Sequence, residues 1–120
     1  MGSKNGNIDI GLVITKSPFE SPLLEASLKM LEDAIAQGHS GDIFLISDGV
    51  FLVKSGQKSR IANIFSKLLE SCDIVIASKD HLMAAGISPE EMLENIEISE
   101  SPYDDLVDQV MEKWEKVVSI

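Results

Sequence analysis

The chain has 120 residues, of which 44% are hydrophobic and 25% are charged, and its formal net charge is −10. This length suits a single domain that buries a hydrophobic core of its own. The negative charge argues against direct binding to nucleic acid or to an anionic membrane surface, because both would repel the protein.

Acidic residues are concentrated toward the C-terminus. Residues 88–116 contain ten acidic side chains and only two lysines, Lys113 and Lys116. Such a segment is interpreted either as a solvated acidic face or as a surface that steers a basic partner.

Cysteine usage and the N-terminal residues bear on the compartment. Cys72 is the only cysteine, so no disulfide can form within the chain, which suits a reducing environment. No apolar run is long enough to cross a bilayer, and the opening MGSKNGN lacks the apolar core of a signal peptide. We therefore expect a cytoplasmic protein with a flexible tail at residues 1–7 and one domain at residues 8–120.

Short apolar runs alternate with segments of helical period. Strands are expected at residues 8–15, 42–47, 73–77, 95–99 and 117–120. Helical segments are expected from Ser21-Pro22 to Gly38, at 50–54, at 61–72, at 79–85, as a single turn at 88–91, and from residue 102 onward. In the last helix, the predicted core-facing stripe is Tyr103, Val107, Val110, Trp114 and Val117.

Strands that are connected by helices run parallel to one another. We therefore predict a single-domain α/β fold with an open, mostly parallel sheet of four to five strands and helices on both faces. Ligands of such sheets bind beyond the carboxyl ends of the strands. This rule selects Lys16-Ser17, Asp48-Gly49, Ser78 to His81, and Ser99-Glu100 as candidate positions.

The segment Ser78-Lys79-Asp80-His81 is the densest polar cluster at a predicted strand end. A cysteine at the start of a helix would be a reactive thiolate. A serine hydroxyl is far less acidic and needs a neighbouring base, for which His81 is the candidate. The alternative is that Ser78 caps the helix while the other three side chains are solvated.

Cys72 lies on the apolar stripe of the preceding helix, which favours a buried and inert thiol. The alternative is an exposed thiol that carries sulfur. Asp48-Gly49 is typical of a turn but could bind a cation or a hydroxyl group, and Ser17 could receive an anion. The sequence contains neither common phosphate-binding motif, and its two histidines are too few to indicate zinc, so no metal and no cofactor are expected.

Three stretches carry a family resemblance. They are TKSPFESPLLEASLKMLEDAIAQGHSGDIFLISDGV, SCDIVIASKDHLMAAGI and NIEISESPYDDLVDQV. Their order and spacing resemble the DsrE/DsrF-like (DsrE/TusD) sulfur-relay family over nearly the whole chain, from Ile8 to Ile120. In that family a loop after the first strand leads to a long helix, the second strand ends in Asp-Gly-Val, and a later strand delivers a cysteine.

The resemblance implies a small subunit that assembles into trimers or hexamers, in a family that passes sulfur as a cysteine persulfide. Counted back from Gly86, the family's cysteine falls on Ser78 and its arginine falls on Ala85. Because persulfide chemistry needs sulfur, we expect a non-carrier member with an accessory, structural or ligand-binding role and with sulfur-relay proteins or similar subunits as partners.

Two alternatives remain open at this point. One is an active sulfurtransferase that uses Cys72. The other is a module that binds a small anion or nucleotide, with Ser17, Asp48, Ser78 and Lys79 lining the pocket, and with Asp80 and His81 beside it.

Overall fold

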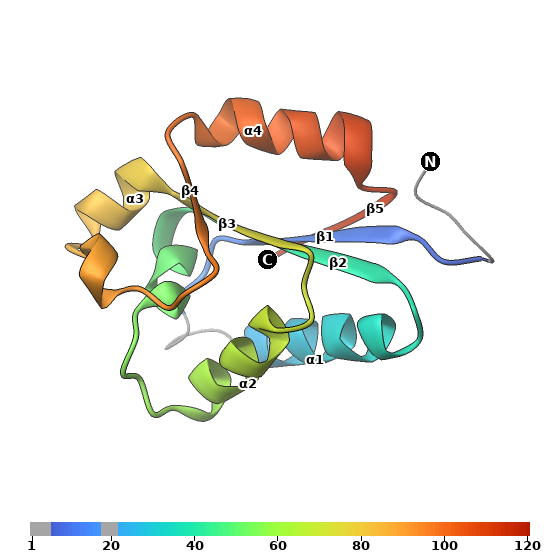
Figure 1. Ribbon diagram of the computed structural model, residues 1–120, viewed down its shortest axis with the longest axis horizontal. Coiled ribbons are helices and arrows are strands. Elements are labelled where there is room, and N and C mark those ends of the chain that lie inside the picture. The colour runs from blue at the N-terminus through green and yellow to red at the C-terminus, as the bar shows by residue number, and fades with distance from the viewer. Residues whose placement is uncertain (1–5, 18–21) are drawn as a thin grey trace.

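A computed structural model describes residues 6–17 and 22–120. In this part of the chain, five parallel strands form one sheet in the order β4-β3-β2-β1-β5 (Figure 1). The strands are β1 (Asp9–Ile14), β2 (Ser40–Leu45), β3 (Ile74–Ser78), β4 (Glu97–Ser99) and β5 (Lys116–Ser119). Neighbouring strands pair in parallel throughout, so the predicted α/β class is confirmed.

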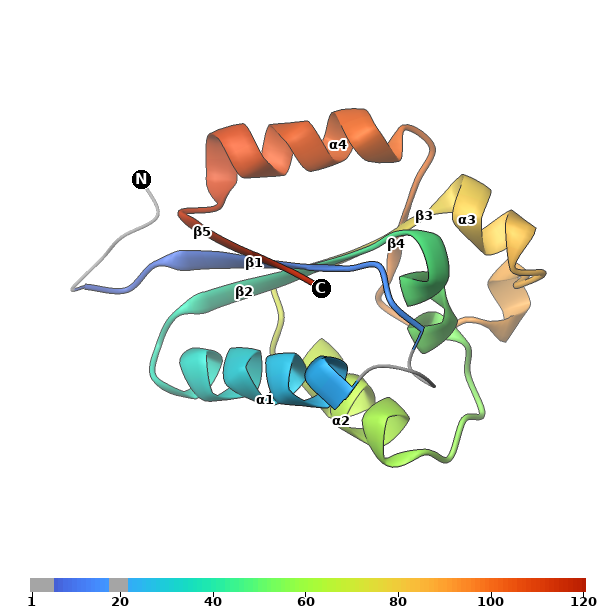
Figure 2. The same cartoon turned by 180° about the vertical axis from the view of Figure 1, so that it is seen from behind.

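Helices cover both faces of the sheet. Helices α1 (Pro22–Ala36) and α2 (Arg60–Leu69) lie on one face, and α4 (Pro102–Asp108) lies on the other (Figures 1 and 2). A π-helical turn, Gln109–Lys113, extends α4 toward β5. Helix α3 (Lys79–Ala84) follows β3 directly, and two 3-10 helices occupy Ser47–Val53 and Pro89–Glu91.

The main core lies between the sheet and helices α1 and α2. On α1 the buried side chains are Leu24, Leu28 and Leu31, which recur at the predicted helical spacing. They pack on alternate side chains of the strands, such as Leu12 and Ile43, which are fully buried.

A smaller core on the α4 face is anchored by Trp114. The indole ring lies directly on Gly11 of β1, where an added Cβ would stand 2.0 Å from ring atom Cδ2. Indole Nε1 donates to Oδ2 of buried Asp42 at 2.9 Å, and Nζ of Lys113 lies 2.8 Å from the same oxygen. The other oxygen, Oδ1, accepts the backbone N–H of Ile74 at 3.1 Å. Asp42 therefore ties β2, β3 and the end of the α4 segment together.

Several predicted bounds are corrected. Strand β2 spans Ser40–Leu45 rather than 42–47, because Ser47 has a left-handed φ of 51°. The Asp48-Gly49 pair is part of the 3-10 helix that begins at Ser47, before the predicted 50–54. Strand β4 begins at Glu97 rather than at residue 95, because Asn95 is also left-handed, at φ 66°. The predicted cap at Ser21 lies outside the described residues.

The predicted core stripe of the last helix is wrong, except for Trp114. The side chains of Tyr103, Val107 and Val110 are exposed, whereas Pro102 is buried and Leu106 packs against the smaller core. Because Pro102 and Leu106 face the sheet, the other flank of α4 faces solvent, and the π-helical turn then directs Trp114 inward.

The helix predicted at 61–72 ends earlier, at Leu69, so Cys72 follows α2 rather than lying on its stripe. Residues 1–5 of the predicted tail lie outside the described residues. Two further predictions agree with the structure. The predicted turn at 88–91 forms as Pro89–Glu91 with its capping box, and β5 confirms the predicted last strand. Among the described residues, no helix is long and apolar enough to span a bilayer.

Candidate functional site

Ser78 is the last residue of β3 and caps the N-terminus of α3. Its side chain is fully buried, and its Oγ accepts the backbone N–H of His81 at 3.4 Å. The residue has extended backbone angles, as a helix cap requires. The hydroxyl is thus held inside the fold by the helix that it caps.

His81 joins α3 to the end of β2. Its ring atom Nδ1 accepts the backbone N–H of Ser47 at 2.9 Å. An accepting Nδ1 carries no proton, so the neutral ring carries its proton on Nε2. The ring also makes an edge-on contact with Tyr103 of α4, with 6.3 Å between the ring centroids.

The backbone of Ser47 turns sharply at this contact. A left-handed φ is uncommon for a residue other than glycine, and such residues cluster at functional sites. Two residues later, Gly49 packs against the end of β1, where an added Cβ would stand 2.1 Å from the carbonyl oxygen of Ile14. The 3-10 helix is therefore pressed closely onto the sheet beside His81.

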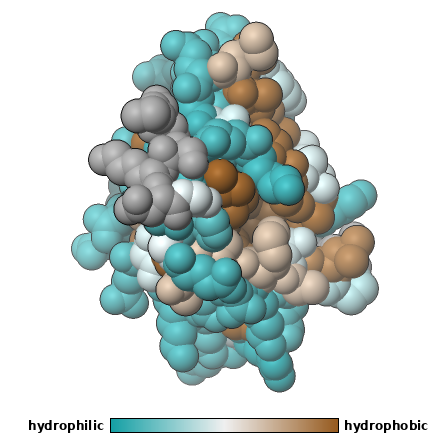
Figure 3. All heavy atoms as spheres, turned by 90° about the vertical axis from the view of Figure 1, so that its right-hand side faces the viewer, coloured by the Kyte–Doolittle hydropathy of each residue, from teal (hydrophilic) through white to brown (hydrophobic). Residues whose placement is uncertain are grey.

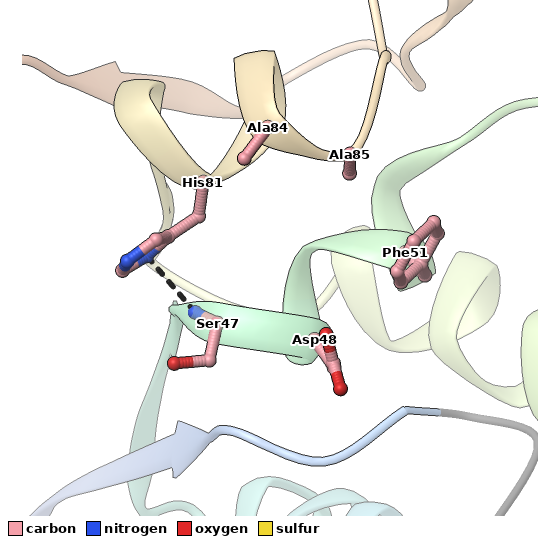
Figure 4. A pocket seen from close by; sticks show the side chains of 6 residues that line it. All are labelled: Ser47, Asp48, Phe51, His81, Ala84 and Ala85. Carbon is pink, nitrogen blue, oxygen red and sulfur yellow. Dashed lines mark hydrogen bonds between the residues drawn. The ribbon is translucent and has the colours of Figure 1, made fainter.

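A cavity of about 170 Å³ lies between α3 and this 3-10 helix. Ser47, Asp48 and Phe51 form one wall, and His81, Ala84 and Ala85 form the other (Figure 4). The cavity is at the carboxyl edge of the sheet, where ligands of parallel α/β folds bind. Its wall combines one hydroxyl, one carboxylate, one imidazole, one aromatic ring and two methyl groups.

The structure brings together only some of the predicted site residues. Asp48 and His81 line the cavity. Ser17 is half-buried beyond the end of β1, and Ser78 is buried beneath the start of α3; neither lines the cavity. The Nζ of Lys79 lies 3.4 Å from Glu100, and Asp80 is exposed on α3.

Four lining residues were not predicted as site residues, namely Ser47, Phe51, Ala84 and Ala85, of which Ala85 was noted only as the position of the family's arginine. Ser47 directly precedes Asp48 at a strand end, so the rule that selected Asp48 could have included it. Phe51 and Ala84 carry no sequence signal, because their place depends on how the 3-10 helix packs against α3.

Cys72 lies at the opposite end of β3 from Ser78. It precedes the strand, is partly buried and packs against the main core. Burial, together with the negative charges of Asp42 and Asp73, raises the pKa of the Cys72 thiol to about 12. The thiol is therefore protonated at physiological pH and is a poor nucleophile.

Within residues 6–17 and 22–120, no group of three or more His, Cys, Asp or Glu side chains is arranged to hold a metal ion. The cavity wall itself offers hydrogen-bonding groups on Asp48 and His81 and apolar contact from Phe51 and the two alanines.

Comparison with known proteins identifies the family. The model of the DsrE/DsrF-like family matches residues 9–117. The chain belongs to this family. The resemblance found from the sequence motifs is thereby confirmed.

Relatives of the chain share its length and its fold. An uncharacterized protein, MK0008 of Methanopyrus kandleri, is 34% identical over 116 residues, which cover 93% of this chain and 94% of that protein. The ychN protein of E. coli has a similar structure, with a TM-score of 0.74, 24% identity and coverage of 94% and 99%. MTH1491 of Methanobacterium thermoautotrophicum, a protein of unknown function, gives a TM-score of 0.72 with 19% identity and coverage of 95% and 100%. At these identities, the two structures support the fold alone.

Proposed function

We propose that this DsrE/DsrF-like chain is an accessory subunit of the intracellular sulfur-relay family that does not itself carry sulfur. The observation behind the proposal is the state of Ser78, on which the family's carrier cysteine falls in the motif comparison. Its oxygen is fully buried and accepts a backbone N–H of α3. An oxygen in this position caps a helix, and it offers no atom that could hold a persulfide.

The state of the single thiol supports the same conclusion. Transfer of sulfur to a cysteine requires a thiolate that reaches the donor. Cys72 is partly buried at the amino end of β3, and its pKa is raised to about 12. The alternative of a sulfurtransferase that uses Cys72 is therefore disfavoured.

The cavity beside His81 suits a small neutral or cationic group better than an anion. Nε2 of the neutral imidazole can donate a hydrogen bond and Asp48 can accept one, while Phe51 provides an apolar wall. No cation lines the cavity, and Lys79 is paired with Glu100. A volume of about 170 Å³ is also below the usual size of a nucleotide-sized pocket, roughly 300 Å³ or more.

Ala85, on the α3 side of the cavity, also supports the accessory role. The motif comparison places the family's arginine on this residue, and Ala85 lines the cavity. A methyl group leaves room where an arginine would bring a positive charge. We infer that the cavity receives a small polar ligand or a side chain of a partner, in a cytoplasmic homo-oligomer or in an assembly with other subunits of the family.

Intact mass measurement tests this proposal. The protein is incubated under native conditions with excess low-molecular-weight persulfide, and its mass is recorded before and after reductant. We expect the unmodified mass in both spectra. A reductant-sensitive gain of one sulfur atom would refute the proposal, and its loss in a Cys72→Ser variant would establish the Cys72 alternative.

A further inference from the structure

One flank of α4 leaves apolar side chains in solvent. The α4 flank consists of Tyr103, Val107, Val110 and Met111, whose exposed fractions are 60%, 57%, 41% and 77%. Val107 follows Tyr103 by four residues, and Val110 and Met111 follow Val107 by three and four, so these side chains adjoin along one side of the helical segment. Val117 of edge strand β5 is also exposed, at 42%, and it pairs with Gly11 beneath the ring of Trp114.

The surface view agrees with this arrangement. In Figure 3, hydrophobic spheres extend from the top of the molecule, where α4 lies in Figure 1, down the right-hand edge of the face shown. Extended apolar surface of this kind is uncommon on a protein surface unless it serves an interaction.

Negative charge borders the α4 flank. Asp104, Asp108 and Glu112 are exposed and recur every four residues, so they form a second row next to the apolar one. Lys113 is the one cation within residues 102–115, and its ammonium group is held by buried Asp42 at 2.8 Å. The acidic row therefore has no counter-charge from its own helical segment.

We propose that the α4 flank is the docking surface for a basic amphipathic helix of another protein. Aliphatic side chains of that helix pack against Val107, Val110 and Met111. Its lysines or arginines pair with Asp104, Asp108 and Glu112, which steer the encounter and set the orientation. The inference goes beyond the accessory role and rests on the surface of α4 alone, so either can fail without the other.

Charge disfavours a two-fold contact in which the α4 flank of one copy meets the α4 flank of another. In that contact the acidic row of one copy would face the same row of the other, and the two rows would repel each other, whereas contact between copies through other surfaces is unaffected. Residues 49–69 form a stretch with four cations and no acidic residue, but α2, which carries two of them, buries its apolar face in the main core and has no such face left to cover the flank. Of these cations, Arg60 is already 3.1 Å from Glu25. A basic amphipathic helix from a different protein can pack on the apolar α4 flank and also pair with the acidic row beside it.

A designed peptide tests the proposal. The probe is a fluorescein-labelled helical peptide of about 18 residues, long enough to form a helix, with leucines on one face and lysines on the other. Anisotropy is recorded with wild type, with Val110→Asp/Met111→Asp, and with Leu23→Asp. Leu23 is 65% exposed on α1, so its variant adds one like charge away from the flank.

We expect the wild type and Leu23→Asp to bind the peptide equally, and the flank variant to bind at least about tenfold more weakly. Affinity should also fall in Asp104→Asn/Asp108→Asn/Glu112→Gln and with added salt. Val107→Thr/Val110→Thr, which keeps the shape of both side chains, should also weaken binding of the peptide. This variant provides the test if the aspartate variant fails to fold.

Four results would overturn the proposal. Three are no binding by the wild type, a loss of affinity in Leu23→Asp equal to that in the flank variant, and equal binding of a matched peptide with glutamates in place of lysines. A fourth is a change of sedimentation mass in the folded flank variants, since this would show that a second copy covers the flank.

Discussion

Substitution of Asp42 by alanine should strongly destabilise the fold. The change removes the acceptor of three donors, namely Nε1 of Trp114, Nζ of Lys113 and the backbone N–H of Ile74. An unsatisfied buried donor costs about 1–3 kcal/mol, and loss of one partner of a buried ion pair costs about 3–5 kcal/mol. The side chain of Lys113 is 31% exposed and can turn to water, so its share is smaller. We expect a total loss of about 3 kcal/mol in the free energy of unfolding.

Urea denaturation followed by tryptophan fluorescence measures this loss directly, because Trp114 is the only tryptophan in the chain. The native emission of the Asp42→Ala variant should also shift to the red as the indole loses its buried partner. Asp42→Asn is the matched control, because the amide keeps the shape of the side chain and one acceptor oxygen. Its free energy of unfolding should fall by less than that of Asp42→Ala. A loss below about 1 kcal/mol in the alanine variant would refute the assigned role of Asp42.

Four further outcomes follow from the structure. Ser78→Ala should lower the free energy of unfolding by about 1 kcal/mol, because the variant loses the cap of α3. Ser59→Ala at the start of α2 should cost about the same, since Oγ of Ser59 accepts a backbone N–H at 3.1 Å. An unchanged free energy of unfolding in Ser78→Ala would contradict the capping role. Gly11→Ala should destabilise the fold by about 1–3 kcal/mol or displace the ring of Trp114, which would shift the tryptophan emission to the red. A wild-type emission spectrum together with an unchanged urea midpoint would count against the packing of Trp114 on Gly11. Alkylation of Cys72 should accelerate with pH without levelling off below about pH 11, because its pKa is about 12, whereas a plateau near neutral pH would reveal a thiolate. The same raised pKa makes the folded state keep its proton while the unfolded state loses it, so stability should fall as pH rises from about 9 toward 12, and Cys72→Ser should remove that fall.

Local patterns were sufficient to predict the architecture. The stripe Leu24, Leu28 and Leu31 gave the inner face of α1, and the Ser88 to Glu91 capping box gave its helical turn. The alternation of strands and helices then required a parallel sheet. These features depend on residues close in sequence, so the sequence carries them directly.

The inner face of α4 was not predictable from helical period alone. Tyr103, Val107 and Val110 share a period with Trp114, yet only Trp114 is buried. Its position depends on the bare backbone of Gly11, far away in the sequence. Period identifies a stripe, but the sheet's opposing surface determines which stripe is buried.

The candidate site was predicted only in part, because it also depends on contacts between residues that are distant in the sequence. The strand-end rule found Asp48 and His81. The rule could not foresee the bond between His81 and the backbone of Ser47, which joins residues 34 positions apart, or the approach of Phe51 to α3 that encloses the cavity.

The claim that this chain does not carry sulfur is tested most directly by the mass of the native wild-type protein after exposure to excess persulfide. We predict one species at the unmodified mass, with no change on reduction. A stoichiometric adduct of one sulfur atom that reductant removes would contradict the account.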